Sequence, residues 1–373
     1  MPEIAIALSG GVDSSVAAAL LVEAGRDVIG VTMRLGVAET AGAPHVHDEV
    51  TLAAEVCASL GIPHVVIDLA DDFRAQVVEP FCDAYASGMT PNPCVRCNER
   101  VKFGLLAARV RELGVPALAT GHYARLARDA SGVWLERAAD AGKDQSYFLY
   151  RVGPGTLGTL EFPLGDLTKA EVRRMAAGRG LPTASRRESQ EVCFTRDHVR
   201  LVATRHPEAL VGGPITDGAG AVLGTHRGIA RYTVGQRKGL GIGGPDGPYE
   251  VLRLDAARNA VVVGPAGGTR VASVTLVEGV WRLGEGEHDV LAQVRYRTRP
   301  APATVRPVAA GLEVVFAHER DPLAPGQSVV MYRGDRVVGG GIVPGTRPRP
   351  DLSGTAETAP GRDVRPARAR TRL

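Results

Sequence analysis

The sequence predicts an α/β protein with a doubly wound parallel sheet, followed by a small β-rich central domain and a C-terminal β barrel. From residue 4 to about residue 180, short apolar runs alternate with helical patterns, and the first run leads through a Gly-rich turn into a helix. From about Val211 the chain changes to short alternating β segments with frequent glycine. The length of 373 residues also exceeds one ordinary domain, for which the expectation is roughly 100 to 200 residues.

The first elements are expected in the order strand, helix, strand, helix, strand. The apolar run IAIAL predicts a strand over residues 4–8, and a helix is expected over 14–24, where Gly25 can end it in a left-handed cap. Strands are predicted over 27–35 and 64–69, with a helix over 49–60 between them. This order is typical of a parallel sheet covered by helices.

A helical pattern over residues 71–87 leads into the turn-rich segment MTPNPCVRCN, and the next helical pattern stops at Gly114. Asn98 is expected to be the N-cap of that helix. A further strand is predicted over 117–126, and Thr168 and Glu171 have the spacing of a capping box for a helix that reaches about Gly178.

The second half predicts small β barrels or sandwiches, from segments such as VLRLDAARNAVVVG and LEVVFAHE. We expect a catalytic domain over residues 1–200, a central β-rich domain over 201–266 and a barrel over 267–345. The segment 346–373 has almost no large apolar residue, so burial cannot offset its chain entropy and a disordered Arg/Pro-rich tail is expected.

The charge of the chain gives no argument for a nucleic-acid partner. The net charge is +3, but residues 346–373 contain seven arginines and three acidic residues, which leaves 37 basic and 38 acidic residues in 1–345. Any RNA contact must therefore rest on local basic clusters. No apolar run approaches the roughly 18 residues of a spanning helix, and the N-terminus lacks the features of a secretory signal. We therefore expect a cytoplasmic protein that does not enter the membrane.

The five cysteines are an odd count in a chain without an export signal, so a structural disulfide framework is not expected. Cys57 and Cys82 lie in helical apolar patterns and are predicted to be core residues. Cys94, Cys97 and Cys193 remain candidates for a metal site or for redox-active thiols.

The segment SGGVDSS, residues 9–15, lies between the first strand and the first helix. Its glycines let the backbone approach an anion, the helix start offers free N–H groups, and the serines add hydroxyl donors. The loop lacks the GK[ST] ending of a Walker A motif, which disfavours kinase or GTPase chemistry. It resembles the loop of the PP-loop ATP pyrophosphatases, which holds the pyrophosphate of ATP during adenylyl transfer. Amidotransferases and lysidine synthases share this loop. The resemblance therefore implies that the protein uses ATP, but it does not identify the substrate.

Three further segments narrow the resemblance: TPNPCVRCNERVKF (90–103), ATGHYAR (119–125) with KDQSYFL (143–149), and ESQEVCF (188–194). Together with YTVGQRKGLGIGG (232–244), VRYR (294–297) and PGQSVVMYRGDRVVGGGI (325–342), they resemble the bacterial tRNA-specific 2-thiouridylases, the MnmA family. The resemblance covers nearly all of the chain except the tail.

The resemblance implies a role for each matching residue. The nucleophile would be Cys97, and Cys193 would receive a persulfide. ATP would be bound, with Mg²⁺, by Ala7, Leu8, Ser9, Gly10, Gly11, Val12, Asp13, Ser14, Met33 and Gly121. The target base or other parts of the tRNA would be contacted by Asn92, Pro93, Cys94, His122, Lys143, Asp144, Gln145, Arg295, Tyr296 and Gln327. A cysteine desulfurase or a sulfur-relay protein would supply the persulfide.

The implied chemistry explains the need for two thiols. The C2 carbonyl of uridine is a poor electrophile, and adenylation by ATP converts its oxygen into AMP, which sulfur can displace. A persulfide on Cys193 would bring the sulfur, and attack by Cys97 on the inner sulfur would release the terminal one and leave a disulfide. Because only thiolates react efficiently, Arg96, Arg100 and Lys102 are expected to depress the pKa of Cys97 if they converge on it in space.

Cys94 departs from the pattern of those family members that carry an acidic residue at this position, where the acid is assigned a role in catalysis. It creates CVRC, which with Cys193 gives three thiolates that could hold a [4Fe–4S] cluster with one open iron. This cluster competes with the persulfide route. Zinc is disfavoured because the chain has no second CxxC. Two other functions also remain open: a PP-loop ligase for a small metabolite, and an RNA-binding protein without catalytic activity.

Overall fold

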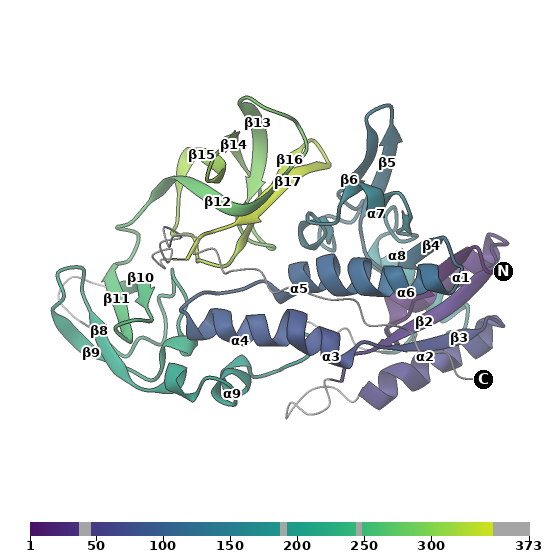
Figure 1. The fold of residues 1–373 in the computed structure, drawn as a ribbon, viewed down its shortest axis with the longest axis horizontal. Helices are drawn as coiled ribbons and strands as arrows, with labels where there is room; N and C mark the ends of the chain where they lie inside the picture. Colours follow the sequence, from purple (N-terminus) through teal and green to yellow (C-terminus); the bar gives the residue numbers. More distant parts are fainter. Residues whose placement is uncertain (37–45, 187–191, 244–247, 346–373) are drawn as a thin grey trace, which may run out of the picture.

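The computed structural model describes residues 1–36, 46–186, 192–243 and 248–345. The predicted tail lies outside these residues. Figure 1 shows three parts: a sheet covered by helices at the N-terminal end of the chain, a small sheet formed by β8 to β11, and a barrel formed by β12 to β17. The predicted fold class is confirmed.

The first part is built on a parallel sheet of five strands in the order β3-β2-β1-β4-β7. Its strands are β1 (Ile4–Ala7), β2 (Val28–Arg34), β3 (His64–Asp68), β4 (Ala117–Thr120) and β7 (Leu160–Glu161). The chain moves outward from β1 to β3 and then returns to pair β4 with the other edge of β1. The carboxyl ends of β1 and β4 therefore lie side by side where the strand order reverses, which is where open α/β sheets bind their ligands.

Helices cover both faces of this sheet, which explains why β1 is apolar throughout. Ile4 and Ile6 pack with α1 (Val12–Glu23), α2 (Val46–Leu60) and α8 (Lys169–Gly178). Ala5, on the opposite face, belongs to the cluster of the helices that follow β3. A strand buried on both faces needs continuous rather than alternating apolar residues.

The helical pattern over 71–87 forms α3 (Ala70–Phe73), the π-helical segment η2 (Arg74–Val78) and α4 (Glu79–Ala86). The π-helical turn precedes Pro80. Proline has no N–H, and its ring excludes the usual helical hydrogen bond to the carbonyl four residues earlier. That carbonyl, on Gln76, instead accepts the Arg96 guanidinium at 2.8 Å. The π turn thus lets a proline sit inside the helix.

The next helix begins earlier than the sequence indicates, so the prediction of Asn98 as its N-cap is wrong. The side chain of Asn92 accepts the Val95 N–H at 3.4 Å, and Pro93 occupies the first turn, where its missing N–H is tolerated. The helix comprises α5 (Pro93–Arg96), the π-helical η3 (Cys97–Leu106) and α6 (Ala107–Glu112). Asn98 is buried, and its amide donates to the Phe148 carbonyl at 3.1 Å.

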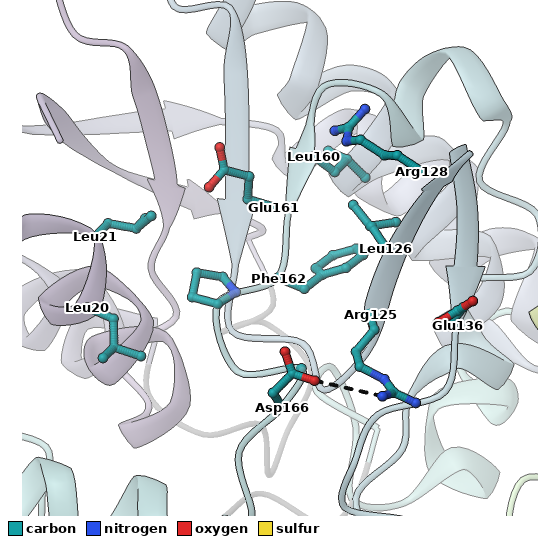
Figure 2. Close-up of a pocket in the computed structure, with 12 residues that line it drawn as sticks. Leu20, Leu21, Arg125, Leu126, Arg128, Glu136, Leu160, Glu161, Phe162 and Asp166 are labelled. Carbon is teal, nitrogen blue, oxygen red and sulfur yellow. Dashed lines mark ion pairs between the residues drawn. The ribbon is translucent and has the colours of Figure 1, made fainter. Parts of the chain in front are cut away.

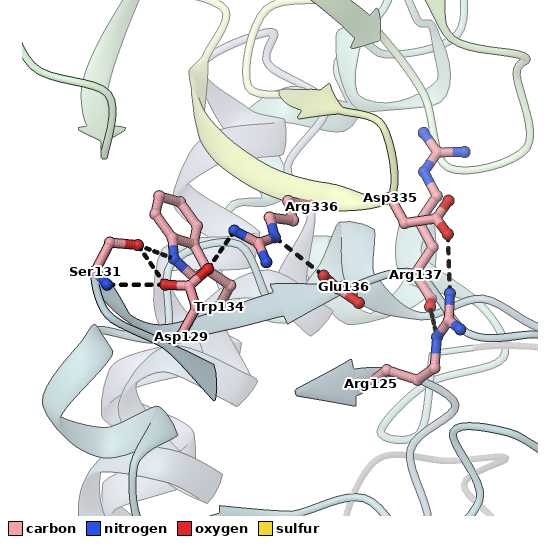
Figure 3. Close-up of polar contacts among 8 residues, drawn as sticks. All are labelled: Arg125, Asp129, Ser131, Trp134, Glu136, Arg137, Asp335 and Arg336. Carbon is pink, nitrogen blue, oxygen red and sulfur yellow. Dashed lines mark hydrogen bonds and ion pairs between the residues drawn. The ribbon is translucent and has the colours of Figure 1, made fainter. Parts of the chain in front are cut away.

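The strand predicted over 117–126 is two strands. β4 ends at Thr120, and the chain turns before β5 (Arg125–Asp129) forms a hairpin with β6 (Gly132–Glu136). This hairpin joins the barrel strand β17 through the pairing of Arg336 with Glu136. Figure 3 shows the ion pairs along this junction, in which Arg336 contacts Asp129 at 2.6 Å and Glu136 at 3.1 Å.

The central sheet has the order β10-β11-β8-β9, in which only β11 and β8 pair in parallel. Its strands are β8 (Gly213–Thr216), β9 (Val222–His226), β10 (Tyr249–Asp255) and β11 (Ala260–Pro265). The shorter helices of the chain are η4 (Ser146–Phe148), α7 (Pro154–Leu157), α9 (His198–Ala203), η5 (Pro207–Leu210) and η6 (Ile229–Arg231).

The C-terminal strands close into a six-stranded barrel because β12 pairs with both β15 and β17. They are β12 (Val271–Trp281), β13 (His288–Gln293), β14 (Ala301–Val308), β15 (Gly311–Arg320), β16 (Ser328–Arg333) and β17 (Arg336–Ile342). Its interior is apolar and includes Leu276, Val305, Val314, Val329 and Met331.

The segment over 144–150 fixes the barrel to the catalytic part. Tyr147 and Tyr150 are fully buried, and their hydroxyls donate to the Ser328 carbonyl at 2.7 Å and the Ser328 hydroxyl at 3.3 Å. Such burial between two domains resembles a core more than a transient contact. In the part of the chain that the structure describes, no helix has both the length and the apolar character of a membrane span.

Candidate active site

The loop between β1 and α1 is shaped by its own hydroxyls. The Ser9 N–H donates to the Ser14 hydroxyl at 3.3 Å, and the Ser14 hydroxyl donates to the Gly11 carbonyl at 3.1 Å. Gly10 has a φ of +64°, and a Cβ there would lie 2.9 Å from the Glu49 carbonyl oxygen, so only glycine fits. Gly11 is the N-cap of α1 and offers no capping side chain. The first turn of α1 is thus suited to an anion.

Two cations that the sequence analysis did not identify lie against this loop. Lys169, which is 9% exposed, donates to the Asp13 carboxylate at 2.6 Å, and the Tyr123 hydroxyl donates to the same oxygen at 2.8 Å. Arg186 donates to the Gly10 carbonyl at 2.6 Å. One signal was present in the sequence: Lys169 is the first residue of α8, where the helix dipole disfavours a cation, so a nearby anion was to be expected.

Gly121 brings the end of β4 against the phosphate loop. A Cβ at Gly121 would lie 2.7 Å from the Ser14 nitrogen and 2.8 Å from the Asp13 carbonyl carbon. The backbones of the two segments are therefore in direct contact at the point where the strand order reverses. Met33 lies at the carboxyl end of β2, the strand next to β1. The predicted nucleotide-binding segments therefore meet at one edge of the sheet.

Cys94 and Cys97 lie in the first turns of the helix that begins at Pro93. Cys94 is exposed, whereas Cys97 is 7% exposed and packs in the same cluster as Val95 and Phe194. Cys193, from a distant part of the chain, is exposed and directly precedes Phe194, whose ring packs on Phe81 at 5.1 Å. All five cysteines are free thiols, and Cys57 and Cys82 are core residues as predicted.

The three candidate thiols share one electrostatic environment. Desolvation by the surrounding protein atoms raises the pKa of Cys94 and of Cys97, and it raises the pKa of Cys193 to about 12, although the side chains of Cys94 and Cys193 are exposed at the surface. Lys102 opposes this increase at each of the three thiols, while charges on Cys97 and Cys94 raise the pKa of Cys193 further. Because such charge effects decrease with distance, they indicate that Cys193 lies in the same region as the CVRC segment.

The three cations do not converge on Cys97: of the three, Lys102 alone lowers its pKa, and burial, together with a smaller effect of Cys94, outweighs it and raises the pKa. Arg96 is bound to the Gln76 carbonyl at 2.8 Å. Arg100 lies beside the Glu99 carboxylate at 3.9 Å. The thiols are consequently protonated at neutral pH.

Lys102 also connects the thiols to the nucleotide side of the site. Burial and then the Lys102 charge hold the pKa of His122 well below its usual range, so His122 is neutral at pH 7. His122 directly follows Gly121, and its Nδ1 lies 2.7 Å from the Thr120 hydroxyl. The charge of Lys102 thus lowers the pKa of Cys94, Cys97 and Cys193 and of the histidine that follows Gly121.

The segment of Lys143, Asp144 and Gln145 contacts the chain next to His122, and its Asp144 and Gln145 side chains accept hydrogen bonds from nearby residues. Asp144 accepts the Ser146 N–H at 3.1 Å and the Ser146 hydroxyl at 2.9 Å, and burial raises its pKa. The side-chain oxygen of Gln145 accepts the Tyr123 N–H at 2.9 Å. Lys143 is half-buried. In this structure the Asp144 and Gln145 side chains therefore stabilise the backbone around residues 144–146 and Tyr123.

The barrel adds Arg295, Tyr296 and Gln327 from its side of the site. The Tyr296 ring packs on Phe148 with centroids 4.3 Å apart, and burial, followed by smaller effects of charges that include Cys94, raises the pKa of Tyr296. Arg295 is exposed and lines a pocket of about 200 Å³ that also includes Arg270 and Arg320. The Gln327 amide donates to the Thr90 carbonyl at 2.8 Å.

A second pocket, of about 500 Å³, lies between α1, β7 and the β5–β6 hairpin (Figure 2). Its charged residues already have protein partners: Arg125 lies 3.8 Å from Asp166, and Glu161 lies 3.3 Å from Arg26. It includes none of the predicted site residues.

Comparison with known families divides the chain into three matches. Residues 2–197 match the family described as tRNA methyl transferase HUP domain, residues 202–265 the tRNA methyl transferase PRC-barrel domain, and residues 272–343 the aminomethyltransferase beta-barrel domain. Among solved structures, the U34-tRNA thiolase NcsA from Methanococcus maripaludis, determined with its [4Fe-4S] cluster, is 20% identical. That match covers 55% of this chain and 68% of NcsA at a TM-score of 0.35, which is too low to support any conclusion about iron.

Curated relatives match over nearly their whole length. The tRNA-specific 2-thiouridylase MnmA of Chloroflexus aurantiacus is 46% identical over 357 residues, which cover 92% of this chain and 98% of the relative. The MnmA of Roseiflexus sp. is 46% identical, with coverage of 92% and 99%. The MnmA of Geobacter metallireducens is 44% identical, with coverage of 91% and 96%. The chain belongs to the MnmA family of tRNA-specific 2-thiouridylases.

Proposed function

We propose that this protein is a tRNA-uridine 2-sulfurtransferase that uses ATP to adenylate the C2 oxygen of the anticodon wobble uridine and then replaces that oxygen with sulfur. The observation that carries the proposal is that the helix of Cys97 reaches the end of β4: the Phe103 ring packs on His122 with centroids 5.7 Å apart, and the Lys102 charge lowers the pKa of the three thiols and of His122. Adenylation and sulfur transfer need an adenylate site beside a pair of thiols, and this contact supports such an arrangement.

The nucleotide step would use the edge of the sheet at β1 and β4. Ser9, Gly10, Gly11 and Ser14 would bind the phosphates of ATP, with Lys169 and Arg186 as the nearby cations. The uridine oxygen would attack the α-phosphorus, and pyrophosphate would leave. Mg²⁺ bound to ATP would neutralise part of the phosphate charge. Neutral His122 would line the space between this site and the cysteines without adding charge.

The sulfur step would use Cys193 as the carrier and Cys97 as the second thiol. A donor protein, a cysteine desulfurase or a sulfur-relay protein, would place a persulfide on Cys193, which is exposed. Cys97 would attack the inner sulfur and release the terminal one, which displaces AMP from the uridine. A disulfide between Cys97 and Cys193 would remain, and an external thiol would reduce it.

The tRNA would bridge the cleft and the β domains. Asn92, Pro93 and Cys94 would contact a flipped uridine, and Arg295 and Tyr296 would contact the tRNA from the barrel. We expect this reaction to take place in the cytoplasm.

The [4Fe–4S] alternative would need Cys94, Cys97 and Cys193 as ligands. Among the described residues, no three His, Cys, Asp or Glu side chains converge as a metal-binding group. The residues as arranged do not fit the cluster, so we derive no step through it. Purification without oxygen and an iron count would decide: stoichiometric iron whose removal abolishes activity would contradict the persulfide route.

The proposal is tested by incubating the protein with tRNA, ATP, Mg²⁺ and a sulfur donor and analysing nucleosides for 2-thiouridine. Cys97→Ser and Cys193→Ser should abolish the product. Cys82→Ala is the matched control, because Cys82 is a buried core thiol outside the site, and it should retain activity. A ligase for a small metabolite would tolerate both serines, and a non-catalytic RNA-binding protein would release no pyrophosphate with tRNA.

A further inference from the structure

The segment from Gly88 to Thr90, which leads from α4 to the cysteines, is held between both β domains. On the central domain, a Cβ at Gly88, where φ is +74°, would lie 2.9 Å from the Leu254 Cβ. The Thr90 hydroxyl donates to the Thr233 hydroxyl at 3.3 Å. These contacts tie one side of the segment to the central sheet.

The barrel binds both backbone polar groups of Thr90. The Thr90 N–H donates to the Pro325 carbonyl at 2.7 Å, and the Gln327 amide donates to the Thr90 carbonyl at 2.8 Å. Gly326 lies between them, and a Cβ at this position would be 3.1 Å from the Thr90 backbone. Three domains therefore meet at one residue.

Gln327 is itself rigidly placed. Its N–H donates to the Ala324 carbonyl at 3.1 Å, and its carbonyl accepts the Val343 N–H at 2.8 Å, next to the end of β17. The side chain therefore extends from a fixed backbone. The carbonyl it holds belongs to a segment outside any helix or strand, whose backbone groups need partners from elsewhere.

We infer that Gln327 is a positioning residue for the cysteine segment: by holding the Thr90 carbonyl, it lets the barrel fix where Asn92, Cys94 and Cys97 stand. The inference rests on the proposed function for its effect on catalysis. It differs from the role that family resemblance implies for Gln327, which is direct contact with tRNA. Asn92 follows Thr90 by two residues and caps the helix of both cysteines, so a displaced Thr90 displaces the helix start.

The test is Gln327→Met, which keeps the length of the side chain and removes the donor. The rate at which iodoacetamide alkylates Cys97 in the free protein, followed by mass spectrometry of its peptide, should increase about tenfold, in line with loss of one hydrogen bond. The kcat for thiolation should fall about 10- to 100-fold, because small misplacements of reacting groups are costly. The Kd for tRNA should stay within about twofold.

Gln293→Met is the matched control. Gln293 is a buried barrel amide that donates to the Tyr296 carbonyl at 2.6 Å, so its loss removes an equivalent bond that does not reach Thr90. It should leave Cys97 alkylation unchanged. Gln327→Glu, which sets a carboxylate against the Thr90 carbonyl, is the second variant and should increase alkylation further.

Two results would overturn the inference. One is a Gln327→Met protein that binds tRNA several-fold more weakly while Cys97 is alkylated at the wild-type rate, as direct tRNA contact requires. The other is an equal increase of alkylation in Gln293→Met. Alkylation is measured without tRNA or ATP, so this readout stands even if the wild-type protein makes no 2-thiouridine, which would instead refute the proposed function.

Discussion

The phosphate loop and the cysteine site are adjacent, but they are built in opposite ways. The loop is formed by one short segment, with cations already in place at Asp13 and Gly10. The cysteine site combines the CVRC segment, Cys193 with Phe194, and the barrel, and desolvation raises the pKa of its thiols so that they are protonated at neutral pH. The difference indicates that the phosphate loop is already arranged to bind a nucleotide in the free protein. The thiols, in contrast, become reactive only when a change in their surroundings lowers their pKa.

Removing the main cation of the loop should have the largest effect. Lys169→Met leaves the Asp13 carboxylate without its ion pair beside the phosphates. We expect tRNA-dependent pyrophosphate release to fall about 10²- to 10³-fold, since loss of one preorganised charged donor typically has this effect. Lys169→Arg, which keeps the charge, should restore part of the rate. Pyrophosphate release within twofold of wild type in Lys169→Met would show that the loop does not depend on this cation.

The contact between β4 and the loop should be nearly as sensitive. Gly121→Ala would place a Cβ 2.7 Å from the Ser14 nitrogen, where backbone must move. Strain of about 1–3 kcal/mol should weaken ATP binding roughly 5- to 150-fold, measured by calorimetry. Gly153→Ala is the control, because a Cβ there meets nothing within 4 Å. Unchanged affinity in Gly121→Ala would place the nucleotide elsewhere.

Lys102→Met should make the three thiols less reactive and His122 easier to protonate. Lys102 lowers the pKa of the three thiols and of His122, so its loss raises all four pKa values. At neutral pH the thiolate fraction then decreases and alkylation of Cys193 slows several-fold, while His122 becomes easier to protonate. Alkylation kinetics against pH and an NMR titration of His122 would show the two effects. Faster alkylation in this variant would contradict the assigned role of Lys102.

The smallest expected effect concerns the interface between the barrel and the catalytic part. Tyr147→Phe removes the hydroxyl that donates to the Ser328 carbonyl at 2.7 Å. The free energy of unfolding should decrease by about 1–2 kcal/mol in denaturant titration. A single cooperative transition at lower denaturant concentration would show that the barrel and the catalytic part unfold as one unit. Two separate transitions would show that they unfold independently and that the interface beside the cysteine site is not rigid.

The sequence predicted well whatever depends on local periodicity and turn chemistry. The strand and helix order up to β3, the Thr168 and Glu171 capping box, and the buried state of Cys57 and Cys82 are examples. The prediction of Asn98 as an N-cap was wrong because Asn92, which directly precedes Pro93, caps the helix instead. The break at Gly121 was missed because it is set by contact with α1, which lies more than a hundred residues earlier in the chain.

The electrostatics of the site could not be read from sequence spacing. Arg96 and Arg100 flank Cys97 along the chain, but a helix directs neighbouring side chains to different faces, and both guanidinium groups have other partners. Burial, which decides the pKa of Cys97, depends on the assembled core. Lys169 and Arg186 were missed for the same reason, since each reaches the loop from a remote segment.

The hairpin of β5 and β6 has a consequence for synthesis on the ribosome. Its partner is Arg336 in β17, 200 residues beyond Glu136. At roughly 5–20 residues per second, translation leaves the hairpin edge without its partner strand for about 10–40 s. The nascent chain therefore exposes an open strand edge for that interval, at which a strand of another chain can add until β17 emerges.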